Sequence, residues 1–370
     1  MIVRRYIFIL LVFNVLFSLP RFSIETGASC IACHINPSGG GMRNDYGSNV
    51  YSIEELPLKR LIKNADDLWD GYITDNLQVG GDFRIQLYDN GEDSKIFPMQ
   101  SDIYANLKIS KNTDMYMKVD TGPDANNEFF VLFKNMFKSS WIKIGKTLPT
   151  YGLKLDDHTS FIRGGNRTPL QDSPFDDVDE GLFFDPQFNK NPTSLEMGVN
   201  LSKQFKLNIS SSTGFFNAIN RDEKEILNSS ASLLYLKQFD SFSILSGISY
   251  MKEKDIVSKG LYGGVSINKW TMSFEVDEVS NWIDFYNSRA AYAQVVYKPV
   301  QGLHLVYKYD YFDRHLDFES GSISRLSAGF EIYPLSILEI KLQVRKNEIK
   351  NLPFAVDLKN EYLLQVHTWF

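Results

Sequence analysis

The sequence has only two cysteines, Cys30 and Cys33, and they lie three positions apart. A scattered disulfide framework is therefore excluded, and the two thiols are expected to act together. The chain has no excess of basic residues, since 39 Lys and Arg stand against 45 Asp and Glu, so nothing indicates a nucleic-acid partner. With 24 Gly and 13 Pro in 370 residues, a collagen-like or disordered chain is also excluded.

The sequence also has no apolar run long enough for a spanning helix, which needs about 20 residues. Its N-terminal apolar run covers residues 6–17 and follows Arg4 and Arg5. A short apolar run behind basic residues is typical of a secretory signal peptide, to which we assign residues 1–23. An uncleaved anchor is the alternative. The remainder is then an exported chain, either soluble or a β-barrel.

Residues 30–34 read Cys-Ile-Ala-Cys-His. In an exported chain this C-x-x-C-H spacing predicts covalent attachment of one haem c, with Cys30 and Cys33 as the attachment thiols and His34 as the proximal iron ligand. A zinc site would need a fourth ligand nearby. A redox-active dithiol would not need His34, and no thioredoxin-like pattern surrounds the motif.

The sixth ligand of the haem iron stays open at this point. Met42 and His158 are candidates for this ligand. A third alternative is that the iron has no protein ligand on that side. For Met42 a plain apolar contact is the alternative that we favour. The haem segment, residues 24–70, is too short for a packed core of its own, so we expect the lumen of a barrel to support it.

From about Leu77 to Phe370 the chain alternates apolar and polar residues. In the clearest stretch, one face carries Leu338, Ile340, Leu342 and Val344, and the other carries Glu339, Lys341, Gln343 and Arg345. Residues 103–109, 303–311 and 325–332 repeat the pattern. Short turns alternate with longer polar connections, among them residues 253–258, which is the pattern of outer-membrane barrels. We therefore predict an all-β fold: a transmembrane antiparallel β-barrel of about 16 strands over residues 71–370, with the haem segment plugging the lumen. A soluble β-sandwich is the alternative.

The last strand places Tyr362, Leu364, Val366, Thr368 and Phe370 on one face, and the chain stops on an aromatic residue. This resembles the C-terminal signature by which outer-membrane barrels are recognised. It implies the barrel assembly machinery and outer-membrane lipid as partners, in a Gram-negative-type bacterium.

Residues 148–192 are too long for an ordinary hairpin connection. The stretch resembles the inward-folding third loop of phosphate-selective and related 16-stranded porins. It is rich in acid, with carboxylates at Asp156, Asp157, Asp172, Asp176, Asp177, Asp179 and Glu180. Carboxylates lining a constriction favour cations and are suitable ligands for ferrous iron. A solvated acidic outer loop is the alternative.

The chain combines a signal peptide, one C-x-x-C-H motif and a single barrel. In this order of parts it resembles the fused outer-membrane monohaem cytochrome c–porins of the ferrous-iron-oxidising type. The resemblance implies electron transfer across the outer membrane, with a periplasmic cytochrome on one side and an extracellular donor or acceptor such as ferrous iron on the other. Residues 36–41 do not match that family, which leaves the donor open. Two other functions remain: a diffusion porin in which the haem segment is a plug or staple, and a soluble periplasmic cytochrome or β-rich binding protein.

Overall fold

The computed structural model describes residues 21–58, 71–121, 127–153, 159–163, 191–215, 227–281, 286–318, 321–350 and 360–370. Short helices in these ranges are α2 (Arg21–Thr26), η1 (Cys30–Ala32), η2 (Gly47–Tyr51), α3 (Ser52–Glu54), η4 (Phe137–Ser139) and η5 (Phe161–Arg163). No helix in the described ranges is long and apolar enough to cross a membrane.

Strands make up most of the described chain. They are β1 (Tyr72–Thr74), β2 (Leu77–Asp89), β3 (Ser94–Ser110), β4 (Thr113–Asp120), β5 (Glu128–Phe133), β6 (Trp141–Lys146), β7 (Thr193–Asn200), β8 (Phe205–Thr213), β9 (Leu227–Gln238), β10 (Phe242–Glu253), β11 (Ile256–Ile267), β12 (Trp270–Ser280), β13 (Ser288–Val300), β14 (Leu303–Asp313), β15 (Ile323–Leu335), β16 (Leu338–Ile349) and β17 (Asn360–Trp369).

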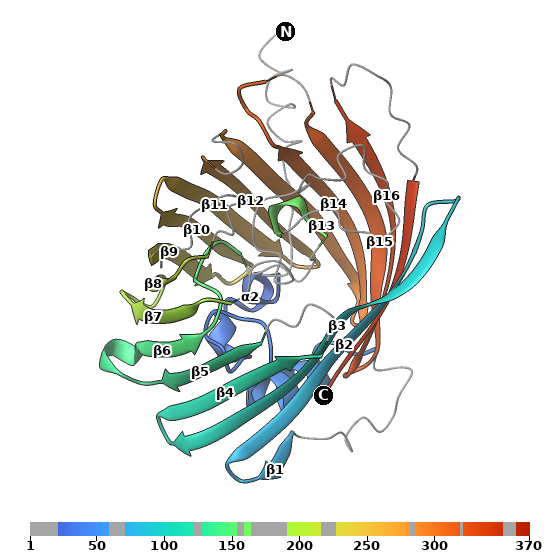
Figure 1. The fold of residues 1–370 in the computed structure, drawn as a ribbon. Helices are drawn as coiled ribbons and strands as arrows, with labels where there is room; N and C mark the ends of the chain where they lie inside the picture. Colours follow the sequence, from blue (N-terminus) through green and yellow to red (C-terminus); the bar gives the residue numbers. More distant parts are fainter. Residues whose placement is uncertain are drawn as a thin grey trace.

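The strands from β2 to β17 form a closed ring (Figure 1). Each pairs antiparallel with its neighbour in sequence, and β17 returns to pair with β2 in a register that runs from Tyr362↔Asp89 to Trp369↔Asp82. The short β1 pairs with the start of β2. The sixteen-stranded barrel predicted from the sequence is therefore confirmed, and the soluble sandwich is not formed.

Burial in the barrel wall is the reverse of that in a soluble protein. On β16, Leu342 and Val344 are 42% and 47% exposed on the outside, whereas Gln343 and Arg345 are buried at 3% each. Arg325, Ser327 and Glu331 on β15 and His304, Lys308 and Asp310 on β14 are likewise buried inside. Apolar side chains face outward along each strand because lipid, rather than water, is the solvent that this face requires.

One connection that the sequence predicts as a longer polar loop is instead a tight turn. Residues 253–258 were predicted as a polar loop, whereas β10 ends at Glu253 and β11 starts at Ile256. Lys254 turns the chain with a φ of 52°, as tight hairpins require. Glu253 and Ile256 both point inward, at 1% and 0% exposure, so the alternation continues through a stretch whose composition suggested a loop.

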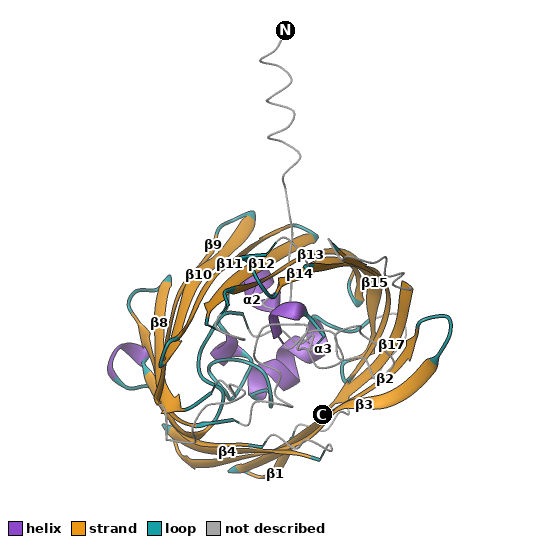
Figure 2. Cartoon of the chain, turned by 45° about the horizontal axis from the view of Figure 1, so that its top comes forward, coloured by secondary structure: helices purple, strands orange, loops and turns teal. Residues whose placement is uncertain are grey.

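Residues 21–58, called the N-terminal segment below, lie inside the ring of strands (Figure 2). Their contacts reach residues next to the short turns: Ser243 and Thr271 near the start of β10 and β12, and Gln301 and Gly302 in the β13–β14 turn. The segment therefore occupies the short-turn end of the lumen, which faces the periplasm in outer-membrane barrels.

Candidate functional site

The C-x-x-C-H motif forms one tight turn within the N-terminal segment. The Cys33 and His34 amides both donate to the Cys30 carbonyl, at 3.0 and 2.9 Å, and η1 begins at Cys30 and ends just before Cys33. The two cysteines are not joined in a disulfide. In the described part of the chain, no three His, Cys, Asp or Glu side chains gather to hold a metal ion.

His34 is fixed by a hydrogen bond that defines the role of each ring nitrogen. Its Nδ1 lies 3.2 Å from the Gly41 carbonyl oxygen, so Nδ1–H donates and Nε2 is the nitrogen that would bind iron. Iron and zinc ligands of this type usually have such a backbone partner. The turn and the imidazole thus fit the donor set that covalent haem attachment needs.

Three consecutive glycines return the chain toward this turn. Gly39, Gly40 and Gly41 all have positive φ, at 91°, 71° and 65°, where other residues would be strained. A Cβ on Gly39 would lie 3.1 Å from the Cys30 Sγ, and one on Gly41 would collide with the Tyr116 hydroxyl. The glycines permit both the bend and the close packing, after which His34 and Arg43 pair in an antiparallel bridge.

Met42 points away from the imidazole in this structure. It is 6% exposed and packs with Ile35 against Tyr104, Tyr116 and Phe130 of the barrel wall. Ile35 and Met42 lie on one side of the small hairpin, and the bridged pair His34 and Arg43 on the other. This arrangement is the apolar contact that the sequence left open for Met42; as a distal ligand, Met42 would have to turn out of that cluster.

His158 and the acidic residues Asp156, Asp157, Asp172, Asp176, Asp177, Asp179 and Glu180 lie outside the described residues. Their roles as distal ligand or as carboxylates of a constriction stay predictions.

The thiols lie in a partly buried, weakly basic environment. Burial raises the pKa of the Cys33 thiol, the neighbouring Cys30 adds to this, and the Arg43 guanidinium partly offsets it. On the other side of the turn, the Lys206 ammonium donates to the Ser29 hydroxyl at 2.5 Å.

Buried charges anchor the N-terminal segment to the wall. Arg21, fully buried, contacts Glu331 at 2.6 Å and the Tyr333 hydroxyl at 2.7 Å. Lys143 and Glu196, both at 0% exposure and 2.8 Å apart, form the second anchor. These are cross-strand partners on β6 and β7.

The second anchor is completed by the N-terminal segment. The Ser38 hydroxyl donates to Glu196 at 2.7 Å, and Lys143 donates to the Asn36 side chain at 3.1 Å. A buried ion pair is tolerated only when its remaining lone pairs and protons are satisfied, so this pair depends on the segment covering it.

Apolar contacts supplement these anchors in three places. Ile24 is fully buried among residues that include Leu236, Leu245 and Tyr262. Ile35 and Met42 join the wall cluster described above, and Tyr51 and Leu56 pack on Tyr333 and Trp369. The segment is therefore a docked part of the fold along its whole described length. Arg21, Phe22 and Ser23, which the sequence assigns to the signal peptide, belong to this docked part.

The described ends of the third loop also turn into the lumen. Arg163 contacts Glu275 at 2.6 Å and Asp277 at 3.1 Å, both on β12 across the barrel. Nearby, the Ser160 hydroxyl donates to Asp310 at 2.5 Å and Arg345 donates to the Thr159 hydroxyl at 2.7 Å. These partners lie nearer the long-loop end than those of the N-terminal segment, so the two segments form successive layers in the lumen.

Sequence reasoning identified the motif but missed its anchors. Arg21, Lys143, Glu196 and Arg163 were not singled out, because each is an ordinary charge on an inward-facing or loop position. The inward face of the strands was predicted, and a charge there needs a partner, but the alternation does not say which charges meet across the lumen.

No protein-family model matches the sequence, and neither does any curated protein. Solved structures do match. OmpT of Vibrio cholerae, described as outer-membrane expressed, superposes with a TM-score of 0.55 at 14% identity, over 81% of this chain and 99% of that one. OprB of Pseudomonas putida superposes with a TM-score of 0.57 at 8% identity, over 80% of this chain and 94% of that one. The outer-membrane channel DcaP of Acinetobacter baumannii superposes with a TM-score of 0.54 at 12% identity, over 81% of this chain and 99% of that one.

At these identities the likeness concerns the fold alone. The matched proteins contain a barrel of the same kind over nearly their whole length. The chain is therefore similar in fold to sixteen-stranded outer-membrane porins.

Proposed function

We propose that the protein is an outer-membrane barrel whose N-terminal segment acts as a plug, carries one covalently attached haem c and transfers electrons across the membrane. The observation that carries this proposal is the position of the C-x-x-C-H turn inside the lumen, on a segment held by the buried Arg21–Glu331 ion pair and by hydrogen bonds to the Lys143–Glu196 pair of the wall. A bound haem c would supply reversible one-electron chemistry.

The residues of this chain would divide the work. Cys30 and Cys33 would provide the thioether attachments, and His34 would provide the proximal nitrogen, oriented by the Gly41 carbonyl. The barrel wall would separate the site from lipid. The short-turn position of the segment supports exchange with a periplasmic electron carrier, while an extracellular donor such as ferrous iron would approach through the lumen past the third loop.

A diffusion porin with a haem-bearing plug is the second candidate function. The structures to which the barrel is similar are porins and channels, and they support this candidate more directly than they support electron transfer. The buried anchors favour electron transfer instead, because a segment docked by charge pairs restricts diffusion through the lumen.

The test begins with protein purified in detergent from outer membranes of a host that attaches haem c. We expect a c-type pyridine haemochrome spectrum with one haem per chain, lost in Cys30→Ala/Cys33→Ala. In liposomes that enclose a redox dye, the loaded protein should pass electrons from an external reductant to the dye.

Two outcomes would decide against electron transfer. Transfer by the haem-free double variant at the rate of the loaded protein would remove the haem from the route. A large, steady single-channel conductance in the loaded protein would favour the diffusion porin.

A further inference from the structure

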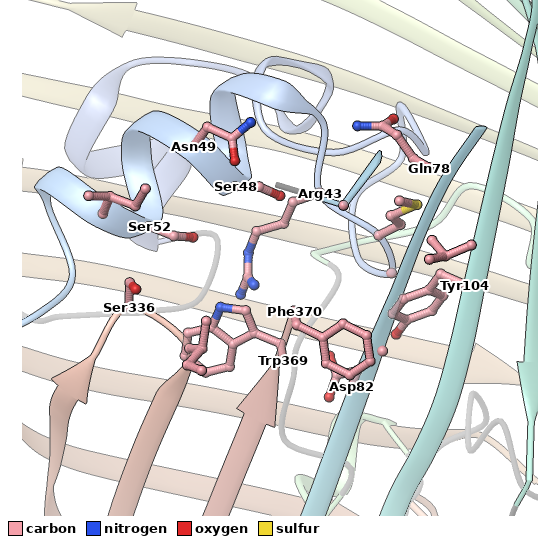
Figure 3. A pocket seen from close by; sticks show the side chains of 17 residues that line it. Arg43, Ser48, Asn49, Ser52, Gln78, Asp82, Tyr104, Ser336, Trp369 and Phe370 are labelled. Carbon is pink, nitrogen blue, oxygen red and sulfur yellow. The ribbon is translucent and has the colours of Figure 1, made fainter. Parts of the chain in front are cut away.

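A cavity lies between the N-terminal segment and the seam where β17 closes on β2. Its volume is about 630 Å³, including space open to solvent. Arg43, Ser48, Asn49 and Ser52 of the segment line one side, and Gln78, Ser336 and Trp369 of the barrel line the other. Figure 3 shows the Arg43 side chain pointing from the segment onto the indole of Trp369.

The cavity contains buried donors without acceptors. The Trp369 Nε1–H and the Ser336 hydroxyl have no hydrogen-bond partner among the described residues, although the two residues are 5% and 1% exposed. The Arg43 guanidinium carbon lies 4.5 Å from the centre of the Trp369 ring. Buried donors without acceptors are costly, and a cation beside them attracts an anionic acceptor.

The indole is held in place on its other faces. It packs with Tyr51, Leu56 and Tyr333, and its ring centre lies 4.7 Å from that of His367. The direction of the Trp369 Nε1–H is therefore set by the barrel together with the N-terminal segment and does not depend on a ligand. This preorganisation reduces the cost of binding.

Asp82 also lines the cavity and would oppose an anion. Its charge is already compensated: the His367 Nε2 lies 2.9 Å and the Arg84 Nε 3.5 Å from its Oδ1. Arg43, which belongs to the segment, also acts electrostatically on Asp82 and adds a third positive charge beside it in the cavity.

Arg43 connects the cavity to the haem motif. It pairs with His34 in the antiparallel bridge, where directly opposed side chains share a face and their Cβ atoms lie about 4.5–5.5 Å apart. A group bound at the His34 imidazole and a group bound at Arg43 are therefore neighbours on one side of the hairpin.

We propose that this cavity is a carboxylate-binding site, in which Arg43, the Trp369 Nε1–H and the Ser336 hydroxyl hold a propionate of the haem bound at Cys30, Cys33 and His34. The assignment to a haem propionate depends on the proposed function; the cavity as a carboxylate site does not. Hydrogen bonds from charged donors to a carboxylate are among the stronger ones in proteins.

The first measurement is the midpoint potential of the haem-loaded protein. Arg43→Gln should lower the potential, because an uncompensated propionate stabilises the ferric state. The matched control is Arg289→Gln, whose guanidinium is 45% exposed on the outside of β13 and pairs with Glu278; it should leave the potential unchanged.

The second measurement is a titration of the full-length haem-free variant Cys30→Ala/Cys33→Ala with acetate, followed by tryptophan fluorescence. Acetate should change the fluorescence, Trp369→Phe should abolish the change, and Arg43→Gln should weaken acetate binding about tenfold or more. Acetate should not alter the potential of the loaded protein, since the propionate already occupies the site.

The outcomes separate the two sources of a carboxylate. If acetate binds the haem-free protein and also shifts the potential of the loaded one, the cavity takes a free carboxylate and the propionate assignment is overturned. If acetate has no effect and Arg43→Gln leaves the potential unchanged, the carboxylate site itself is overturned. If the purified protein contains no haem, the proposed function fails, and the acetate titration still decides the cavity.

Discussion

The pair formed by Lys143 and Glu196 offers a direct test of how the N-terminal segment is held. Glu196→Gln would leave a fully buried lysine without its carboxylate, with only the Asn36 and Ser38 side chains as partners. Removing one member of a buried ion pair costs about 3–5 kcal/mol. Undocking of the segment would let water reach Lys143 and would recover part of this cost.

The magnitude follows from that range. Because about 1.4 kcal/mol corresponds to a factor of ten, full recovery of this cost would raise the undocking equilibrium by about 100-fold to several thousand-fold, and partial recovery raises it by less. Single-channel recording in planar bilayers measures the effect: Glu196→Gln should visit a higher conductance level far more often than the wild type.

Two variants make this test specific. Glu278→Gln disrupts the Arg289–Glu278 pair, whose side chains are 45% and 46% exposed, and an exposed pair contributes at most about 1 kcal/mol. Glu278→Gln should therefore visit the higher conductance level as rarely as the wild type does. Lys143→Met/Glu196→Leu removes both charges and should restore much of the docking. A folded Glu196→Gln protein with wild-type conductance would refute the anchoring role of this pair.

Three further predictions concern other parts of the lumen and the motif. Arg163→Gln leaves Glu275 and Asp277 buried without their guanidinium and should increase conductance noise, because the third loop loses its ion pairs to β12; unchanged recordings would contradict this. In haem-free protein, the raised pKa of Cys33 predicts slow alkylation by iodoacetamide at pH 7, with a rate that increases up to and beyond pH 9; fast reaction at neutral pH would show a thiolate. Mass spectrometry of the mature protein should find Arg21 retained, since cleavage after Ser23 would remove the fully buried guanidinium that pairs with Glu331 and leave Lys341 as its remaining cation in that contact.

Much of the fold was predictable from the sequence because a membrane barrel imposes a strict period of two on each strand. The outward face of residues 338–344, the inward charges of the same stretch and the aromatic C-terminus all follow from one requirement, that lipid and lumen lie on opposite sides of a single sheet. The turn at Lys254 and Asp255 escaped this reasoning, since a polar tight turn has the same composition as a short loop.

The sequence by itself also determined the candidate chemistry, because C-x-x-C-H is a local motif whose function depends on spacing within one turn. Only the tertiary structure decided where that turn lies and what holds it: Arg21 against Glu331, Lys143 against Glu196, and Met42 directed toward the wall. These contacts join residues that are 310 and 53 positions apart, or in the case of Met42 depend on which side of a hairpin meets the wall. Local propensity and alternation carry no information on such pairings, which arise when a docked segment must satisfy every charge that it buries.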